Sequence, residues 1–120
     1  MAEIIVLDDV TDAAVLVKRI LERKGHSVQA FTEEEDLLKH IEDNEVHLAI
    51  LDIKLKKMTG IEVLEEIKKK APEVKVIMLT GYPTLETARE ALRLGAGEYC
   101  VKPIDKNELE QKVSEVLQQA

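Results

Sequence analysis

The sequence predicts an α/β fold: a three-layer, doubly wound (βα)5 arrangement around a parallel five-stranded sheet of order 2-1-3-4-5. Two observations support this prediction. Five short apolar runs alternate with five segments whose apolar residues recur at helical spacing. The first run, at 4–7, is continuously apolar, as expected of a strand buried on both faces of a parallel sheet.

In the first half of the chain, cap residues mark the ends of the expected helices. We expect Asp12 to cap a helix over 13–24 and Gly25 to end it in the left-handed conformation. The segment 32–35 has the capping-box pattern, and we interpret the acidic run 33–36 as a solvated helix start. The expected elements are a strand at 4–7, a helix at 13–24, a strand at 27–31, a helix reaching about 43 and a strand at 47–52.

The second half repeats this alternation. Pro72 ends one helix, Gly95 ends the next, and Asp105 with Glu108 forms a capping pattern that opens the last helix. The expected elements are helices at 61–70 and 84–94, strands at 74–79 and 98–101, and a final helix with one apolar stripe formed by Leu109, Val113, Val116 and Leu117.

Composition narrows the class of protein. The chain has 120 residues, which predicts a single domain over 1–120 with a proper core. A net charge of −7 and an aromatic content of 2% argue against direct binding of nucleic acid by this domain. No apolar run approaches a membrane span, and the chain shows no secretory signal. The single cysteine, Cys100, is interpreted as a buried structural thiol, and a cytoplasmic location is expected.

Four of the five expected strands end in a functional group. The first ends in Asp8 and Asp9, the third in Asp52, the fourth in Thr80 and the fifth in Lys102. In the predicted strand order the first and third strands are neighbours, so the three carboxylates meet where the order reverses. Like charges at that distance repel unless a cation intervenes, and an all-oxygen acidic site suits Mg²⁺. With a lysine and a hydroxyl nearby, the set is typical of phosphoryl transfer to a carboxylate nucleophile.

Taken together, these residues resemble the receiver domain of bacterial two-component response regulators, similar to chemotaxis regulators, whose fold is flavodoxin-like. The resemblance covers essentially the whole chain. It is carried by Asp8-Asp9, Asp52, Thr80-Gly81, Leu94-Gly95-Ala96 and Tyr99-Cys100-Val101-Lys102-Pro103.

The resemblance implies that the chain functions in a phosphorelay and that these motifs form its phosphorylation site. Asp52 would accept a phosphoryl group from a sensor histidine kinase or a phosphotransfer protein, in a Mg²⁺-dependent reaction. Asp8, Asp9, Asp52 and the main-chain carbonyl of Lys54 would bind the metal. The domain would catalyse only its own phosphorylation and dephosphorylation and would be a signalling switch, not an enzyme acting on other substrates.

Three more residues receive roles from the resemblance. Lys102 would pair with the phosphoryl group, and the Lys102–Pro103 peptide bond would be cis. Thr80 would hydrogen-bond the phosphoryl group, and Tyr99 would move inward with it as the switch. The face formed by the fourth helix, fifth strand and fifth helix would be the output surface and a homodimer interface, although by sequence it could equally be ordinary surface.

Some positions depart from the family pattern or carry little signal. Thr59 stands where the family usually has proline. Lys54 and Tyr82, two residues beyond Asp52 and Thr80, occupy positions that vary in the family and bear on the lifetime of the phosphate. The three histidines, His26, His40 and His47, have no metal-ligand spacing and are interpreted as solvated or capping residues.

Three other functions remain as alternatives. A phosphohydrolase with an aspartyl nucleophile would need a second acid two residues after Asp52, where this chain has Lys54. A flavin-binding electron carrier would need a phosphate-cradling loop after the first strand, where the acidic sequence is unsuitable. An interaction module that has lost phosphorylation is disfavoured by the intact acidic set and Lys102.

Overall fold

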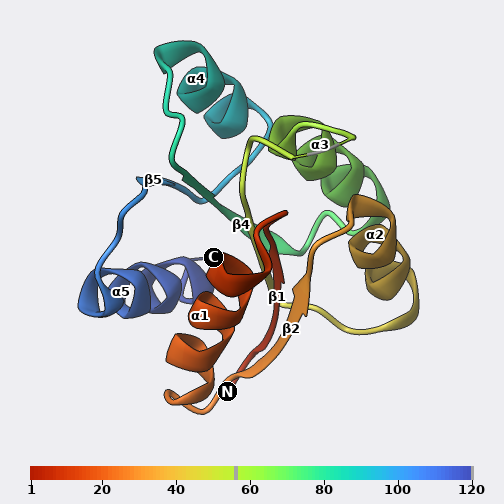
Figure 1. Ribbon diagram of the computed structural model, residues 1–120. Helices are drawn as coiled ribbons and strands as arrows, with labels where there is room; N and C mark the ends of the chain where they lie inside the picture. Colours follow the sequence, from red (N-terminus) through yellow and green to blue (C-terminus); the bar gives the residue numbers. More distant parts are fainter. Residues whose placement is uncertain (56, 120) are drawn as a thin grey trace.

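The computed structural model describes residues 1–55 and 57–119 and contains five alternating strand–helix pairs (Figure 1). The five strands form one parallel sheet in the order β2-β1-β3-β4-β5, which confirms the predicted fold class and strand order. The elements are β1 (Glu3–Leu7), α1 (Thr11–Glu22), β2 (Ser27–Phe31), α2 (Glu34–Asp43), β3 (Leu48–Leu51), α3 (Gly60–Lys70), β4 (Lys75–Thr80), α4 (Leu85–Arg93), β5 (Glu98–Val101) and α5 (Lys106–Leu117).

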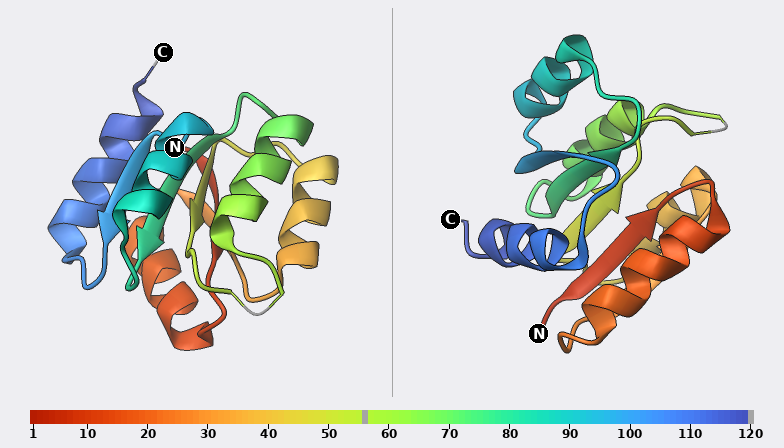
Figure 2. Two further views of the ribbon diagram at one scale, coloured as in Figure 1. Left: turned by 90° about the horizontal axis from the view of Figure 1, so that it is seen from above. Right: turned by 60° about the vertical axis from the view of Figure 1, so that its left-hand side comes forward.

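Helices cover both faces of the sheet and create two cores (Figure 2). Alternate residues along a strand point to opposite faces, so Ile5 and Leu7 of β1 face α2, α3 and α4, while Ile4 and Val6 face α1 and α5. The central strands β1 and β3 are buried on both faces of the sheet, and this explains why their sequences are continuously apolar.

The helix ends agree with the sequence only in part. Asp105 accepts a hydrogen bond from Glu108 N at 2.9 Å and caps α5, and Gly25 and Gly95 have φ of +92° and +99°, all as predicted. The prediction that Asp12 caps α1 is wrong: the helix begins at Thr11 after an uncapped Val10, and Asp12 lies in the first turn.

The predicted capping box at 32–35 is also wrong. The N-cap of α2 is Glu33, whose side chain makes no capping hydrogen bond. Capping boxes occur instead at Thr59–Glu62, opening α3, and at Thr84–Thr87, opening α4. Neither of these two capping boxes was predicted from the sequence.

The two ends of the sheet are distinct. The carboxyl edge collects the loops that follow β1, β3, β4 and β5, and the amino edge carries the N-terminus and the turns that precede the strands (Figures 1 and 2). Within the described ranges, no helix has the length and apolar character needed to cross a membrane.

Candidate functional site

The three predicted acids meet at the carboxyl edge of the sheet. The register pairs Leu7 of β1 with Leu51 of β3, so the residues that follow these two positions are neighbours. Asp52 N donates to Leu7 O at 3.0 Å, which extends the ladder by one residue and fixes the start of the loop after β3. One carboxylate oxygen from each of Asp8, Asp9 and Asp52 lies within 4.8 Å of the others.

Lys102 bridges two of these acids. Its Nζ lies 2.5 Å from Asp8 Oδ2 and 3.1 Å from Asp52 Oδ2. Burial by itself lowers the pKa of the Lys102 ammonium, but the hydrogen bonds to Asp8 and Asp52 and the negative charges of these acids together outweigh it, so the pKa is raised overall. The sequence predicts three like charges that repel unless a cation intervenes, and in the structure the Lys102 ammonium is one such cation, because it neutralises part of their charge.

Backbone amides fix the orientation of the two buried acids. Asp52 is 8% exposed, and its Oδ1 accepts a hydrogen bond from Ile53 N at 2.7 Å. Asp8 is 5% exposed, and its Oδ1 accepts from Val10 N at 2.9 Å. Each carboxylate therefore uses one oxygen to accept from the backbone and the other to contact Lys102, whereas Asp9 is half-buried beside them.

The loop between β3 and α3 closes tightly on the end of β3. Gly60 N donates to Ile53 O at 2.7 Å, and a Cβ at Gly60 would lie 1.9 Å from the carbonyl oxygen of Asp52. Only glycine can occupy this position without displacing the backbone beside Asp52. Near the start of the loop, the Lys54 ammonium lies 4.3 Å from the ring centroid of Tyr82, a cation–π contact between the two positions singled out in the sequence.

Thr80 and Tyr99 lie in different surroundings. Thr80 is completely buried at the end of β4, and its hydroxyl accepts a hydrogen bond from Tyr82 N at 3.0 Å. Tyr99 on β5 is half-buried, and its hydroxyl lies 2.8 Å from Thr87 Oγ1 on α4. The structure therefore places Asp8, Asp9, Asp52 and Lys102 in one cluster, while the Tyr99 hydroxyl bonds to α4. The Lys102–Pro103 peptide bond is cis, as predicted.

The donor set of the acidic cluster suits a hard divalent cation. Three carboxylates converge within 4.8 Å, and Mg²⁺ prefers oxygen ligands while retaining some of its own water. Within residues 1–55 and 57–119, no nitrogen or sulfur ligand belongs to the cluster, which disfavours a softer transition metal.

Glu34 is a buried residue at this edge that the sequence did not reveal. It is 2% exposed, and its Oε2 accepts hydrogen bonds from Lys57 N at 3.0 Å and Met58 N at 2.8 Å in the β3–α3 loop. Burial raises the pKa of Glu34, but hydrogen bonds from backbone amides, including Met58 and Lys57, and the charge of Lys57 lower it overall. The interpretation of 33–36 as a solvated helix start is therefore wrong for Glu34, which no pattern distinguishes from its acidic neighbours.

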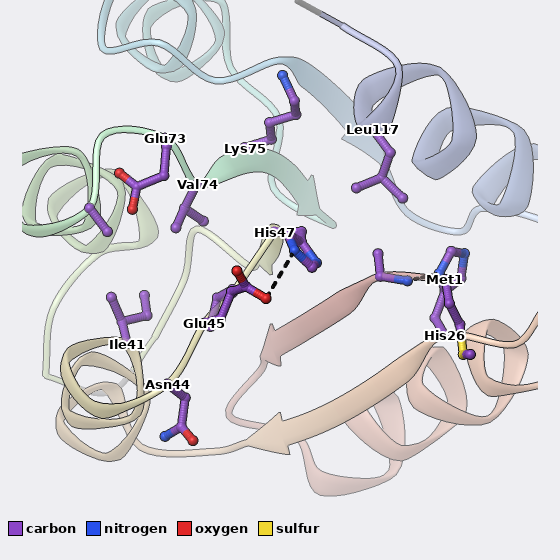
Figure 3. Close-up of a pocket in the computed structure, with 13 residues that line it drawn as sticks. Met1, His26, Ile41, Asn44, Glu45, His47, Glu73, Val74, Lys75 and Leu117 are labelled. Carbon is purple, nitrogen blue, oxygen red and sulfur yellow. Dashed lines mark hydrogen bonds and ion pairs between the residues drawn. The ribbon is translucent and has the colours of Figure 1, made fainter.

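Two of the histidines lie at the opposite, amino edge of the sheet. They line a cavity of about 550 Å³ together with Met1, Glu45 and Leu117 (Figure 3).

Both of these histidines also bond to the backbone at the start of β1. Nδ1 of His26 accepts a hydrogen bond from Ala2 N at 3.1 Å, and Nδ1 of His47 accepts from Glu3 N at 2.9 Å. Both side chains thus cap the start of β1. Burial, the N-terminal charge and Lys24 lower the pKa of His26, which favours the neutral ring that this hydrogen bond requires.

Comparison with known families finds a match over most of the chain. Residues 4–114 match the family model described as the response regulator receiver domain. Among curated proteins, the transcriptional regulatory protein ZraR of Klebsiella oxytoca is 33% identical over 115 residues, covering 96% of this chain and 26% of that protein. The nitrogen assimilation regulatory protein NtrX of Azorhizobium caulinodans is 35% identical, covering 89% of this chain and 24% of that protein. The chain thus spans about a quarter of the length of these relatives.

Solved structures show the same architecture. A CheY-like response regulator receiver domain protein from Methanospirillum hungatei JF-1 superposes with a TM-score of 0.94 at 38% identity, covering 98% of this chain and 94% of that one. The receiver domain of a putative LuxO repressor protein from Vibrio parahaemolyticus superposes with a TM-score of 0.91 at 26% identity, covering 98% of this chain and 90% of that one.

Proposed function

Because this chain belongs to the response regulator receiver domain family, we propose that Asp52 is the phosphoryl acceptor of a phosphorelay. A carboxylate oxygen of Asp52 attacks the phosphorus of a phosphohistidine on a sensor histidine kinase or phosphotransfer protein. The P–N bond breaks, its electron pair returns to the imidazole nitrogen, and an aspartyl phosphate forms. The observation that carries this proposal is the cluster of three carboxylates around Asp52 with Lys102 bridging two of them.

The residues around Asp52 divide the remaining work. Asp8, Asp9, Asp52 and the carbonyl of Lys54 would hold Mg²⁺, which supplies neutralisation of the negative charge on the phosphoryl oxygens. Lys102, 3.1 Å from Asp52 Oδ2, is close enough to pair with a phosphoryl group on that side chain. Thr80, at the end of the adjacent strand, offers its hydroxyl as a hydrogen-bond donor.

The output of the switch involves the α4–β5–α5 face. Thr80 and Tyr99 are the switch residues of the proposal, and the Tyr99 hydroxyl already contacts α4 through Thr87. In support of a binding role for this face, Leu85, Leu92 and Val101 are exposed on it. It would serve an effector or a second copy of the chain as a homodimer interface.

The proposed location and partners of the domain follow from the same family assignment. Residues 1–120 would form one cytoplasmic receiver domain that catalyses only its own phosphorylation and dephosphorylation and does not itself contact nucleic acid. The family match over 4–114 and the negative charge of the chain support this assignment. Signalling would depend on partner proteins and not on a small-molecule substrate.

Phosphorylation by acetyl phosphate tests the proposal. With Mg²⁺ present, the wild-type chain should gain one base-labile phosphoryl group, seen by intact-protein mass spectrometry, and Asp52→Asn should gain none. Asp43→Asn is the matched control, because Asp43 is an exposed acid at the far end of α2. Equal phosphorylation of Asp52→Asn and wild type would show that Asp52 is not the acceptor.

A further inference from the structure

The β3–α3 loop is held from outside by one buried carboxylate. Glu34, the first residue of α2, is 2% exposed and accepts hydrogen bonds from the backbone amides of both Lys57 and Met58. A carboxylate is rarely buried to this extent unless its charge is satisfied by hydrogen bonds. Because the bonds join residues 23 and 24 positions apart, they tie two separate elements and are not local capping contacts.

A second contact joins the first residue of α3 to the start of the same loop, beside Asp52. Gly60 N donates to Ile53 O at 2.7 Å, and the absence of a side chain at Gly60 lets the loop pass against the Asp52 carbonyl. Asp52 and Lys54 therefore lie at the start of a segment whose two anchors are the Gly60 contact and Glu34. A loop that carries functional groups needs such anchors, because a displacement of about 1 Å can cost about a hundredfold in rate.

We propose that Glu34 is a positioning residue for the phosphorylation site: its carboxylate holds the β3–α3 loop in the path that presents Asp52 and the Lys54 carbonyl to a divalent cation. This inference rests on the proposed function. Hydrogen bonds to an ionised acceptor are about twice as strong as neutral ones, so one side chain can hold two loop amides.

The acidic neighbours of Glu34 do not share this role. Among the described residues, the side chains of Glu33 and Glu35 form ion pairs with Lys57 at 4.0 and 3.6 Å and accept from neither loop amide, and they are 41% and 80% exposed. Exposed ion pairs of this kind contribute little to stability. The structure therefore supplies a matched control, since Glu35→Ala removes the same charge from the same helical turn and leaves both loop amides bonded.

Glu34 and Mg²⁺ should stabilise the same path of the loop, and this makes them energetically coupled. Coupling between two sites is reciprocal, so whatever Glu34 adds to metal affinity, the metal adds to the stability of the Glu34 contacts. The amides of Lys57 and Met58 report directly on those contacts.

The first measurement is the rate of phosphorylation by acetyl phosphate as a function of Mg²⁺ concentration. In Glu34→Ala the half-saturating Mg²⁺ concentration should rise by about tenfold, as expected for losing hydrogen bonds to a charged group. The maximal rate should change by less than about threefold, because Asp52 and Lys102 remain. Glu34→Gln keeps an acceptor oxygen but loses the charge, so it should fall between wild type and Glu34→Ala. Glu35→Ala should be indistinguishable from wild type.

The second measurement uses wild type, so it does not depend on how well a variant folds. Saturating Mg²⁺ should slow amide hydrogen exchange of Lys57 and Met58 by about tenfold, the reciprocal of the affinity change. Unaltered exchange at both amides, or an unchanged half-saturating Mg²⁺ concentration in Glu34→Ala, would overturn the proposal. A lower maximal rate with unchanged half-saturation would overturn it too, since that is general structural damage. A wild-type chain that takes no phosphoryl group at any Mg²⁺ concentration would instead refute the proposed function and remove the inference with it.

Discussion

At the residue scale, Lys54 and Tyr82 form a contact that bears on the lifetime of the phosphate. They follow Asp52 and Thr80 by two residues each, and the Lys54 ammonium lies 4.3 Å from the Tyr82 ring centroid. Hydrolysis of an aspartyl phosphate needs a water molecule aligned with phosphorus and opposite the leaving carboxylate. Neither side chain offers a carboxylate or an amide to orient such a water, and the cation–π contact holds both together.

We predict slow self-dephosphorylation because this pair shields the phosphoryl group. The double variant Lys54→Asn with Tyr82→Glu should lose phosphate about tenfold faster in Mg²⁺, equal to about 1.4 kcal/mol of barrier. The decay of the phosphorylated species, followed by mass spectrometry after removal of acetyl phosphate, gives the rate. An unchanged or slower decay would contradict shielding and would leave the receiver assignment intact.

The site residues that could be predicted from the sequence are those that directly follow a strand of the sheet. Asp8, Asp9 and Asp52 follow two strands that are neighbours in the sheet, so the strand order brings these three acids together. Lys102 follows the edge strand β5 and contacts Asp8 and Asp52 through its long side chain. Glu34 lies among other acids at a helix start, and its burial depends on a loop more than twenty residues away. No local pattern encodes that tertiary contact.

At the element scale, α4 is the least firmly packed helix of the fold. Ala91 is its one buried residue, whereas Leu85 and Leu92 are more than half exposed. Its N-terminus depends on the Thr84–Thr87 capping box, and Thr87 also bonds to Tyr99. Elements with few buried apolar contacts are the ones that open or shift most easily. A change at Thr80 or Tyr99 can therefore alter the surface of α4 at small energetic cost.

Helix boundaries were predicted to within about two residues, but of the helix N-caps only Asp105 was predicted correctly. Asp12 has the residue type of an N-cap, yet α1 already begins at Thr11, and the N-cap is Val10, whose side chain makes no capping hydrogen bond. Asp105 and the two left-handed glycines were predicted because turn geometry at those positions is set locally. The cap of α5 and the two glycine turns could therefore be predicted from local sequence, whereas the start of α1 and the burial of Glu34 could not.

The small buried face of α4 gives a prediction about the switch. Beryllofluoride with Mg²⁺, which stands in for a phosphoryl group on Asp52, should change the NMR shifts of Thr80, Tyr99 and the amides over 88–99. The physical reason is that the ligand contacts the two states of the switch differently. Asp52→Asn should show no such changes under the same conditions. Shift changes confined to the acidic edge of wild type would contradict the proposed switch.

At the scale of the whole molecule, the fold brings like charges together at the carboxyl edge of the sheet. The chain carries a net charge of −7, and three of its acids meet at one edge of the sheet. Lys102 pairs with Asp8 and Asp52, so in the part of the chain described here Asp9 is the member of the cluster that this lysine leaves uncompensated. The metal-free fold therefore retains repulsion at the same edge that suits a divalent cation.

This balance predicts how Mg²⁺ affects the stability of the whole domain. A ligand that binds only the native state stabilises it by mass action, by about 2.7 kcal/mol at one hundred times the dissociation constant. Mg²⁺ should therefore raise the melting temperature of wild type by several degrees. Asp9→Asn should abolish this increase and should also melt higher than wild type without metal, because one repelling charge is gone.

Asp12→Asn is the control, since Asp12 is exposed on the first turn of α1 and close in sequence to Asp9. It should keep the full Mg²⁺ increment, whereas a general effect of divalent salt on the negative chain would act on both variants alike. Calorimetric melts of the three proteins with Mg²⁺ and with a chelator separate these cases. If wild type melts at the same temperature in both solutions, the acidic edge is not a metal site, and Lys102 alone accounts for the stability of the cluster.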